Sequence, residues 1–330
     1  MCGIVTVFKN ANLNFANDTI VRNVMEQLTY VGALRGWDST GMFARVPDQP
    51  VSMYKRNLQP SDFLQLKETA QLLQSSNRSR FLVVHSRAAT KGSVTTDNAH
   101  PFQHGSLTGV HNGTLRSWAN LTTESFSTDS EHIYHALSKN TFEDVLQKLN
   151  GAFTLIWYDD STNHMHVIRN DERPFTFIKV KEMDALFGAS EVDMLKWILK
   201  RNTLTIEKTW SPAPMQYYIF DMDNPTVPLS SKKLKEYEPP KSTTKWKTTN
   251  NWNNDYDYYN GYSGAKDYAK KKNEVKVTFK KTKFIPYNTA AAMGKTEGIS
   301  IAGLEIVMFN TRENDLEMDV KYEGIGISRP

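Results

Sequence analysis

Cysteine is almost absent from this chain of 330 residues, since Cys2 is the single one. One cysteine excludes an intrachain disulfide framework and suits a reducing compartment. The first residues lack the basic region and apolar run of a secretory signal peptide. No stretch approaches the ~18 consecutive apolar residues of a transmembrane helix. These absences favour a cytoplasmic protein with no membrane partner.

Apolar residues and net charge are both modest. The hydrophobic share is 39%, which is below that of a typical globular chain, and the formal net charge is only +4. Such a charge indicates no particular class of partner. The length suffices for one large domain or two.

The position of Cys2 is more informative than its rarity. It follows Met1 and precedes a β-branched and aromatic run at 4–8, which predicts a buried strand. Removal of Met1 would place a thiol and a free α-amine on one Cα. An α-amine, with an unperturbed pKa near ~7.7–8.0, can act as a base toward the thiol. Taken alone, this position of Cys2 could equally be an accident.

Polar loops follow several predicted strands. Residues 35–41 contain two glycines around an Arg and an Asp, which indicates a tight loop against a polar surface or simply a turn capped by Asp38. The strand predicted at 81–85 leads into a small-residue loop with Arg87. Arginine suits bidentate recognition of a carboxylate, although a surface arginine is the plainer interpretation.

Asn112 and Gly113 follow a short predicted strand at 107–111. A side-chain amide beside a glycine N–H offers two donors that can stabilise an oxyanion. On this pair alone a hairpin turn is the favoured interpretation, because Asn-Gly is the strongest short hairpin signal. Asp129 stands at the start of a predicted helix, where it can cap the helix or present a carboxylate.

The predicted elements mix helices and strands without regular alternation. Helices are expected from Asn17 to Val31, over 60–73, from Thr128 onward and over 191–199. The many strands between them favour an α+β fold with sheets packed on sheets over a doubly wound fold.

Eight short segments in a fixed order carry a family resemblance. They are Met-Cys-Gly-Ile-Val at 1–5, Arg-Gly-Trp-Asp-Ser-Thr-Gly at 35–41, His-Ser-Arg-Ala-Ala-Thr at 85–90, Asn-Ala-His-Pro at 98–101, Val-His-Asn-Gly at 110–113, Thr-Asp-Ser-Glu at 128–131, Gly-Ala-Phe at 151–153 and Ala-Ser-Glu at 189–191. Together they resemble the glutaminase domain of class II glutamine amidotransferases, which are N-terminal-nucleophile hydrolases. The glucosamine-6-phosphate synthase and amidophosphoribosyltransferase branch is the most similar. The resemblance covers residues 2–222.

The resemblance implies a four-layer αββα sandwich with Cys2 at the edge of a sheet. It implies that Cys2 is the nucleophile toward the side-chain amide of glutamine and that its α-amine is the general base. Asn112 and the Gly113 N–H then resemble the oxyanion hole. The implied route is a γ-glutamyl thioester that water hydrolyses, with ammonia passing to an acceptor. No cofactor and no metal are expected.

The resemblance also implies residues that bind the substrate. Arg87, with Thr90 beside it, resembles the group that holds the α-carboxylate of glutamine, and Asp129 resembles the partner of its α-ammonium. Arg35 and Gly36 resemble the loop that supports the nucleophile. A zwitterion needs both a cation and an anion in a buried site.

Two positions depart from the family pattern. Ala88 stands where an aromatic residue often follows the arginine, and Lys91 stands where the family has a histidine. Both changes weaken the expectation of a closing lid and a sealed ammonia channel, more than that of amide cleavage.

The expected domains are a glutaminase domain at 2–228, a flexible linker rich in Lys, Tyr and Asn at 229–274, and a small β-rich segment at 275–330. This remainder is too short for the sugar-isomerase or phosphoribosyltransferase domains of the family, so we expect the acceptor on another protein. Lysines interleaved with aromatic residues at 231–273 could alternatively contact single-stranded nucleic acid.

Three alternatives to this function remain open from the sequence. A metal hydrolase could draw on six histidines, although none shows a recognised ligand spacing with a catalytic glutamate. The six are His85, His100, His104, His111, His132 and His135. A different N-terminal-nucleophile amidase is the second alternative, and a non-catalytic nucleic-acid-binding or scaffold protein is the third.

Overall fold

The computed structural model describes residues 2–10, 13–238, 299–301 and 304–306. The chain divides into two units, residues 1–241 and 242–330. Within the second unit, the described residues form one antiparallel pair, β14 (Ile299–Ile301) and β15 (Leu304–Ile306). Most of the predicted linker, and the rest of the predicted β-rich segment, lie outside the described residues.

The first sheet of the larger unit positions Cys2. Its strands are β1 (Gly3–Lys9), β2 (Ser39–Ala44), β3 (Ser52–Arg56), β4 (Phe81–Arg87), β9 (Thr176–Val180), β10 (Ala185–Ala189) and β11 (Ile206–Trp210). The spatial order is β11-β9-β10-β1-β4-β2-β3, with antiparallel neighbours throughout. Because β1 pairs on both sides, with β10 and β4, the residue before it is held firmly.

The second sheet is also antiparallel. Its strands are β5 (Phe102–His104), β6 (Leu107–Ser117), β7 (Asn150–Asp159), β8 (His164–Arg169), β12 (Gln216–Asp221) and β13 (Ser230–Lys233), in the order β13-β12-β8-β7-β6-β5. Strand β13 lies beyond residue 228, where the glutaminase domain was expected to end. Its exposed polar residues, which the sequence places in the expected linker, pair with β12 as an edge strand.

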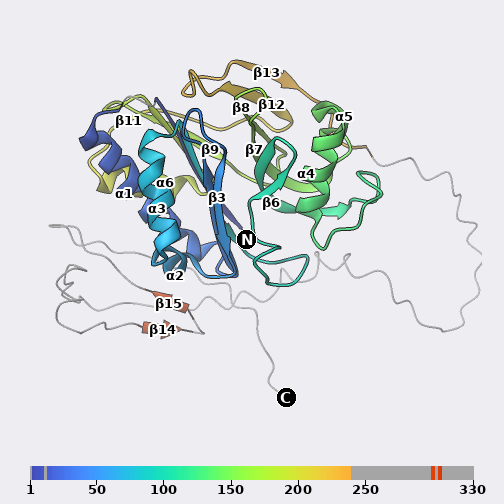
Figure 1. Ribbon diagram of the computed structural model, residues 1–330, viewed down its shortest axis with the longest axis horizontal. Coiled ribbons are helices and arrows are strands. Elements are labelled where there is room, and N and C mark those ends of the chain that lie inside the picture. Colours follow the sequence, from blue (N-terminus) through green and yellow to red (C-terminus); the bar gives the residue numbers. More distant parts are fainter. Residues whose placement is uncertain (1, 11–12, 239–298, 302–303, 307–330) are drawn as a thin grey trace, which may run out of the picture. The chain divides into compact units, whose positions relative to one another are not determined.

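Helices cover the outer face of each sheet (Figure 1). They are α1 (Phe15–Val31), α2 (Pro60–Leu64), α3 (Lys67–Ser75) and α6 (Val192–Arg201) on the first sheet, and α4 (Asp129–Lys139) and α5 (Phe142–Leu146) on the second. Short 3-10 turns follow α1 at Gly32–Leu34 and α3 at Ser76–Arg78. A third apolar cluster fills the space between the two sheets. This arrangement confirms the predicted α+β sandwich of αββα type.

Several element boundaries differ from the sequence predictions. Helix α1 begins at Phe15, two residues before the predicted start, because the side chain of Asn14 accepts a hydrogen bond from the Asn17 N–H and caps the helix. The helix predicted at 60–73 is two helices, since Leu66 adopts an extended backbone between them. None of the helices in the described part of the chain has the length and apolar character needed to span a bilayer.

Candidate active site

The sulfur of Cys2 lies against the peptide backbone of Ala88. The Ala88 N–H donates to Sγ over 3.2 Å, and the thiol donates to the Ala88 carbonyl over 3.3 Å. Burial raises the pKa of the Cys2 thiol, while the Ala88 N–H and the positive charge of Arg87 oppose that rise. Asp129 also acts on the thiol and raises its pKa. The fold thus brings three widely separated predicted residues, Cys2, Arg87 and Asp129, within electrostatic range of one another.

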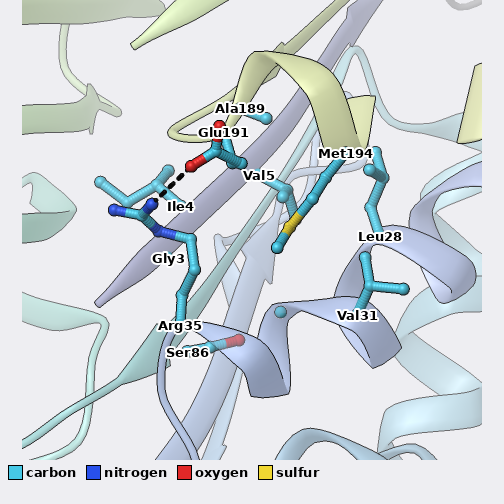
Figure 2. Close-up of a pocket in the computed structure, with 11 residues that line it drawn as sticks. Gly3, Ile4, Val5, Leu28, Val31, Arg35, Ser86, Ala189, Glu191 and Met194 are labelled. Carbon is cyan, nitrogen blue, oxygen red and sulfur yellow. Dashed lines mark hydrogen bonds and ion pairs between the residues drawn. The ribbon is translucent and has the colours of Figure 1, made fainter. Parts of the chain in front are cut away.

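The carbonyl of Cys2 is held by two side chains. Arg35 donates from Nε over 3.0 Å, and Asn112 donates from Nδ2 over 3.0 Å. Glu191, just before α6, pairs with the other end of the Arg35 guanidinium at 3.0 Å, as Figure 2 shows. The loop after α1, strand β6 and the entry to α6 therefore converge on Cys2. Arg35, which the resemblance places in the loop that supports the nucleophile, thus contacts the carbonyl of Cys2.

Figure 2 also shows a small cavity behind this arrangement. It lies between β1, α1 and α6 and is lined by apolar side chains together with Arg35 and Glu191. Its volume is about 20 Å³, which is room for about one water molecule. It is too small for an amino acid.

Asn112 and Gly113 lie in the middle of strand β6 and form no hairpin turn. The Asn112 amide donates to the Cys2 carbonyl and, over 2.8 Å, to the hydroxyl of Ser190. Gly113 has a φ of +150°, and a Cβ there would lie 1.8 Å from the carbonyl oxygen of Ala152 on β7. The glycine is therefore required by the β6–β7 pairing itself, whatever its part in catalysis.

Ser190 was not predicted as a site residue. It is buried, and its hydroxyl accepts hydrogen bonds from the Ile4 N–H over 3.0 Å and from Asn112. It therefore ties β1 to β6 directly beside Cys2. The signal was present in the Ala-Ser-Glu segment at 189–191, which also supplies Glu191.

Arg87 is 4% exposed and points into its own loop. Its guanidinium donates to the carbonyls of Ser93, over 3.2 Å, and Lys91, over 2.5 Å. Burial lowers the pKa of Arg87, and the charges of Cys2, Asp38 and Asp129 oppose this. Gly36 lies against this loop, because a Cβ on it would lie 2.5 Å from the Arg87 carbonyl carbon.

Asp129 and Thr90 both contact the C-terminal half of β6. Asp129, the first residue of α4, accepts from the Leu115 N–H over 2.8 Å and from the Ser130 N–H over 3.0 Å. Its buried carboxylate is therefore fixed in position at the helix N-terminus. Thr90 forms a hydroxyl–hydroxyl hydrogen bond of 2.9 Å with Thr114.

The six candidate histidines fall into two separate clusters. His85, His100 and His111 are buried near the site, with the His85 and His100 rings 3.9 Å apart between centroids. Burial lowers the pKa of each, and that of His85 to about 3, so all three are neutral at physiological pH. The other three, His104, His132 and His135, surround Phe126. Within the described ranges, no group of three His, Cys, Asp or Glu side chains is arranged to hold a metal.

Comparisons with known proteins find similar glutamine amidotransferases. Residues 85–197 match the model of a glutamine amidotransferase domain. The glutamine–fructose-6-phosphate aminotransferase (isomerizing) of Streptococcus pyogenes serotype M3 is 34% identical over 170 residues, covering 47% of this chain and 25% of that protein. Its counterpart in Corynebacterium diphtheriae is 32% identical over 181 residues, covering 47% of this chain and 27% of that protein. The chain therefore spans about a quarter of the length of these relatives.

Among solved structures, the glutamine phosphoribosylpyrophosphate amidotransferase of B. subtilis, complexed with ADP and GMP, has a TM-score of 0.53 and 18% identity. The alignment covers 70% of this chain and 49% of that one. At this identity the likeness shows the fold. The chain therefore contains a glutamine amidotransferase domain that is homologous to those of class II enzymes, and it has the fold of N-terminal-nucleophile hydrolases.

Proposed function

We propose that this chain hydrolyses glutamine with Cys2 as the nucleophile, and that the ammonia passes to an acceptor bound by another protein. The observation that carries the proposal is the convergence of Cys2, Asn112, Arg87 and Asp129 from four separate segments of the chain. The relatives are about four times the length of the region that they share with this chain.

The proposed reaction proceeds through a thioester. After removal of Met1, the α-amine of Cys2 takes the thiol proton, and the thiolate attacks the side-chain carbonyl carbon of glutamine. The carbon–nitrogen bond breaks, and the same proton leaves with the amide nitrogen as ammonia. Water then attacks the thioester carbon, which releases glutamate and restores the thiol.

The neighbouring groups fit a free amino acid. A carboxylate near Arg87 and an ammonium near Asp129 would each give a buried charge a partner of opposite sign. Gly113 and Asn112 are proposed to hold the oxyanion. Both amide hydrogens of Asn112 are engaged, so it would give up its contact with Cys2 or Ser190 to do so.

The purified chain is expected to release glutamate and ammonia from glutamine in equal amounts. Cys2→Ala removes the nucleophile, so the rate should fall more than about 1,000-fold. Intact-mass measurement after labelling with a γ-glutamyl diazoketone should show loss of Met1 and one adduct on wild type but none on Cys2→Ala. Undiminished hydrolysis by Cys2→Ala, or a mature chain that retains Met1, would overturn the proposal.

A further inference from the structure

The peptide group that contacts the sulfur of Cys2 is held on both sides by one residue, Asp38. The Asp38 N–H donates to the Arg87 carbonyl over 3.0 Å. Its carboxylate Oδ2 accepts from the Ala89 N–H over 2.6 Å. Between these two anchor points lies Ala88, whose N–H donates to Cys2 Sγ over 3.2 Å. The direction of the Ala88 N–H therefore depends on Asp38.

The local backbone explains this geometry. Strands β2 and β4 pair up to Ser39 and Arg87, and the Asp38–Arg87 hydrogen bond extends the pairing by one residue. Beyond this point the Ala89 N–H donates to the carboxylate of Asp38, where a longer strand would offer a backbone carbonyl. Gly36 leaves no room between the two loops, because a Cβ on it would lie 2.5 Å from the Arg87 carbonyl carbon. The loop around Asp38 is thus packed directly against residues 87–89.

We propose that Asp38 is a positioning residue that aims the Ala88 N–H at the nucleophilic sulfur and so stabilises the thiolate. The inference rests on the proposed function, because it assumes that the sulfur of Cys2 is the nucleophile. A hydrogen bond donated to an ionised group favours the charged form. The negative charge of Asp38 acts in the opposite direction, because it repels a thiolate. The hydrogen-bond geometry of Asp38 therefore stabilises the Cys2 thiolate, whereas its charge destabilises it. Substitutions at Asp38 can separate these two effects.

The test measures the rate at which iodoacetamide alkylates Cys2 as a function of pH, in the full chain, followed by intact mass. Cys2 is the only cysteine, so adducts that are absent from a Cys2→Ala control report on its sulfur. Asp38→Asn keeps an oxygen acceptor for the Ala89 N–H and removes the charge. Asp38→Ala removes both. All variants must share the same N-terminus, because the α-amine also acts on the sulfur.

Asp38→Ala is expected to move the midpoint of the alkylation curve to higher pH and to slow alkylation about tenfold near neutral pH. Asp38→Asn is expected to have a midpoint at or below that of wild type. The alkylation rate on the high-pH plateau reports how accessible the sulfur is. It therefore distinguishes a loosened loop, which changes the plateau, from a changed thiol pKa, which moves the midpoint. In glutamine hydrolysis, Asp38→Ala should lower kcat more than it raises KM, and Asp38→Asn should restore most of the rate.

Two results would overturn the role of Asp38. One is an Asp38→Ala midpoint that stays in place or falls, since charge or access alone would then explain the data. The other is a raised midpoint in folded Asp38→Asn, which remains informative even when Asp38→Ala does not fold. Alkylation needs no glutamine, so its outcome is independent of whether the chain proves to be a glutaminase.

Discussion

Cys2 is fixed at both its carbonyl and its sulfur before any substrate arrives. Arg35 and Asn112 hold the carbonyl, and Ala88 contacts the sulfur. Such fixation places the proposed nucleophile at the rigid start of β1 and would lower the entropic cost of reaching an attack geometry. The buried thiol has a raised pKa, so a neighbouring base is needed near neutral pH. The α-amine freed by removal of Met1 is the base that we propose.

Substitution of Arg87 tests the substrate site at the residue scale. Arg87→Ala removes the cation proposed to bind the α-carboxylate, so KM for glutamine should rise about 100-fold or more. Arg116→Ala is the matched control, because Arg116 is exposed and paired with Glu172 on the far half of β6. Steady-state kinetics with glutamine give KM for both variants. Equal KM values for the two variants would contradict the assignment of Arg87.

At the scale of elements, strand β6 carries the site. It pairs along almost its whole length with β7, and Gly113 lies opposite Phe153 in that pairing. The same strand presents Asn112 to Cys2 and receives Asp129 at Leu115. A change in the β6–β7 pairing would therefore displace the nucleophile support and the proposed ammonium site together.

Gly113→Ala tests this dependence. The new Cβ would clash with the Ala152 carbonyl oxygen, and φ at this position is +150°. The free energy of unfolding should therefore fall by at least about 3 kcal/mol. Urea denaturation gives the value. Gly105→Asn is the control at the β5–β6 turn, where φ is +59° and the nearest atom to a new Cβ is 3.9 Å away. Asn tolerates that conformation, and its cost should stay below about 1 kcal/mol. Comparable losses in the two variants would contradict the steric argument.

At the scale of the whole domain, three apolar layers enclose several neutral histidines. His85 lies between the sheets near the site. His166 stacks on Trp157 in the second sheet, and a hydrogen bond of 2.7 Å joins its Nδ1 to the Tyr217 hydroxyl. Burial lowers the pKa of both His85 and His166 to about 3. Charging these rings requires them to leave the core, so acid should unfold the domain.

The direction of this pH effect follows from the two protonation states. An unfolded histidine titrates near pH ~6.5, so between that value and about 3 the unfolded chain binds a proton that folded His166 does not. Stability therefore falls as the pH falls through this range, by about 2 kcal/mol between pH 7 and pH 5 for this one residue. In His166→Gln the free energy of unfolding should fall by about 2 kcal/mol less between pH 7 and pH 5 than in wild type. Urea denaturation at both pH values would show this. Equal pH dependence in the variant and wild type would refute the assignment.

Much of the fold and part of the site could be predicted from local pattern. The strand after Cys2 and the helix beginning at Asp129 are set by short-range periodicity and capping, and both are present. The Asn112–Gly113 pair shows where local pattern fails. Its strongest local preference is a turn, yet pairing along β7 keeps it in a strand. Strand β13 was missed for a similar reason, since its polar residues pair only because β12 offers a free edge.

The order of amino acids supplies the reactive groups: a lone cysteine beside the N-terminus, an ordered set of polar segments, and the alternation that forms two sheets. Which of these groups come into contact depends on how the sheets and loops pack together. Arg35, Ser190, Glu191 and Asp38 act on Cys2 or its neighbours through hydrogen bonds between residues far apart in the chain. The physical reason is that hydrogen bonds act over about 3 Å in space, whatever the separation along the chain.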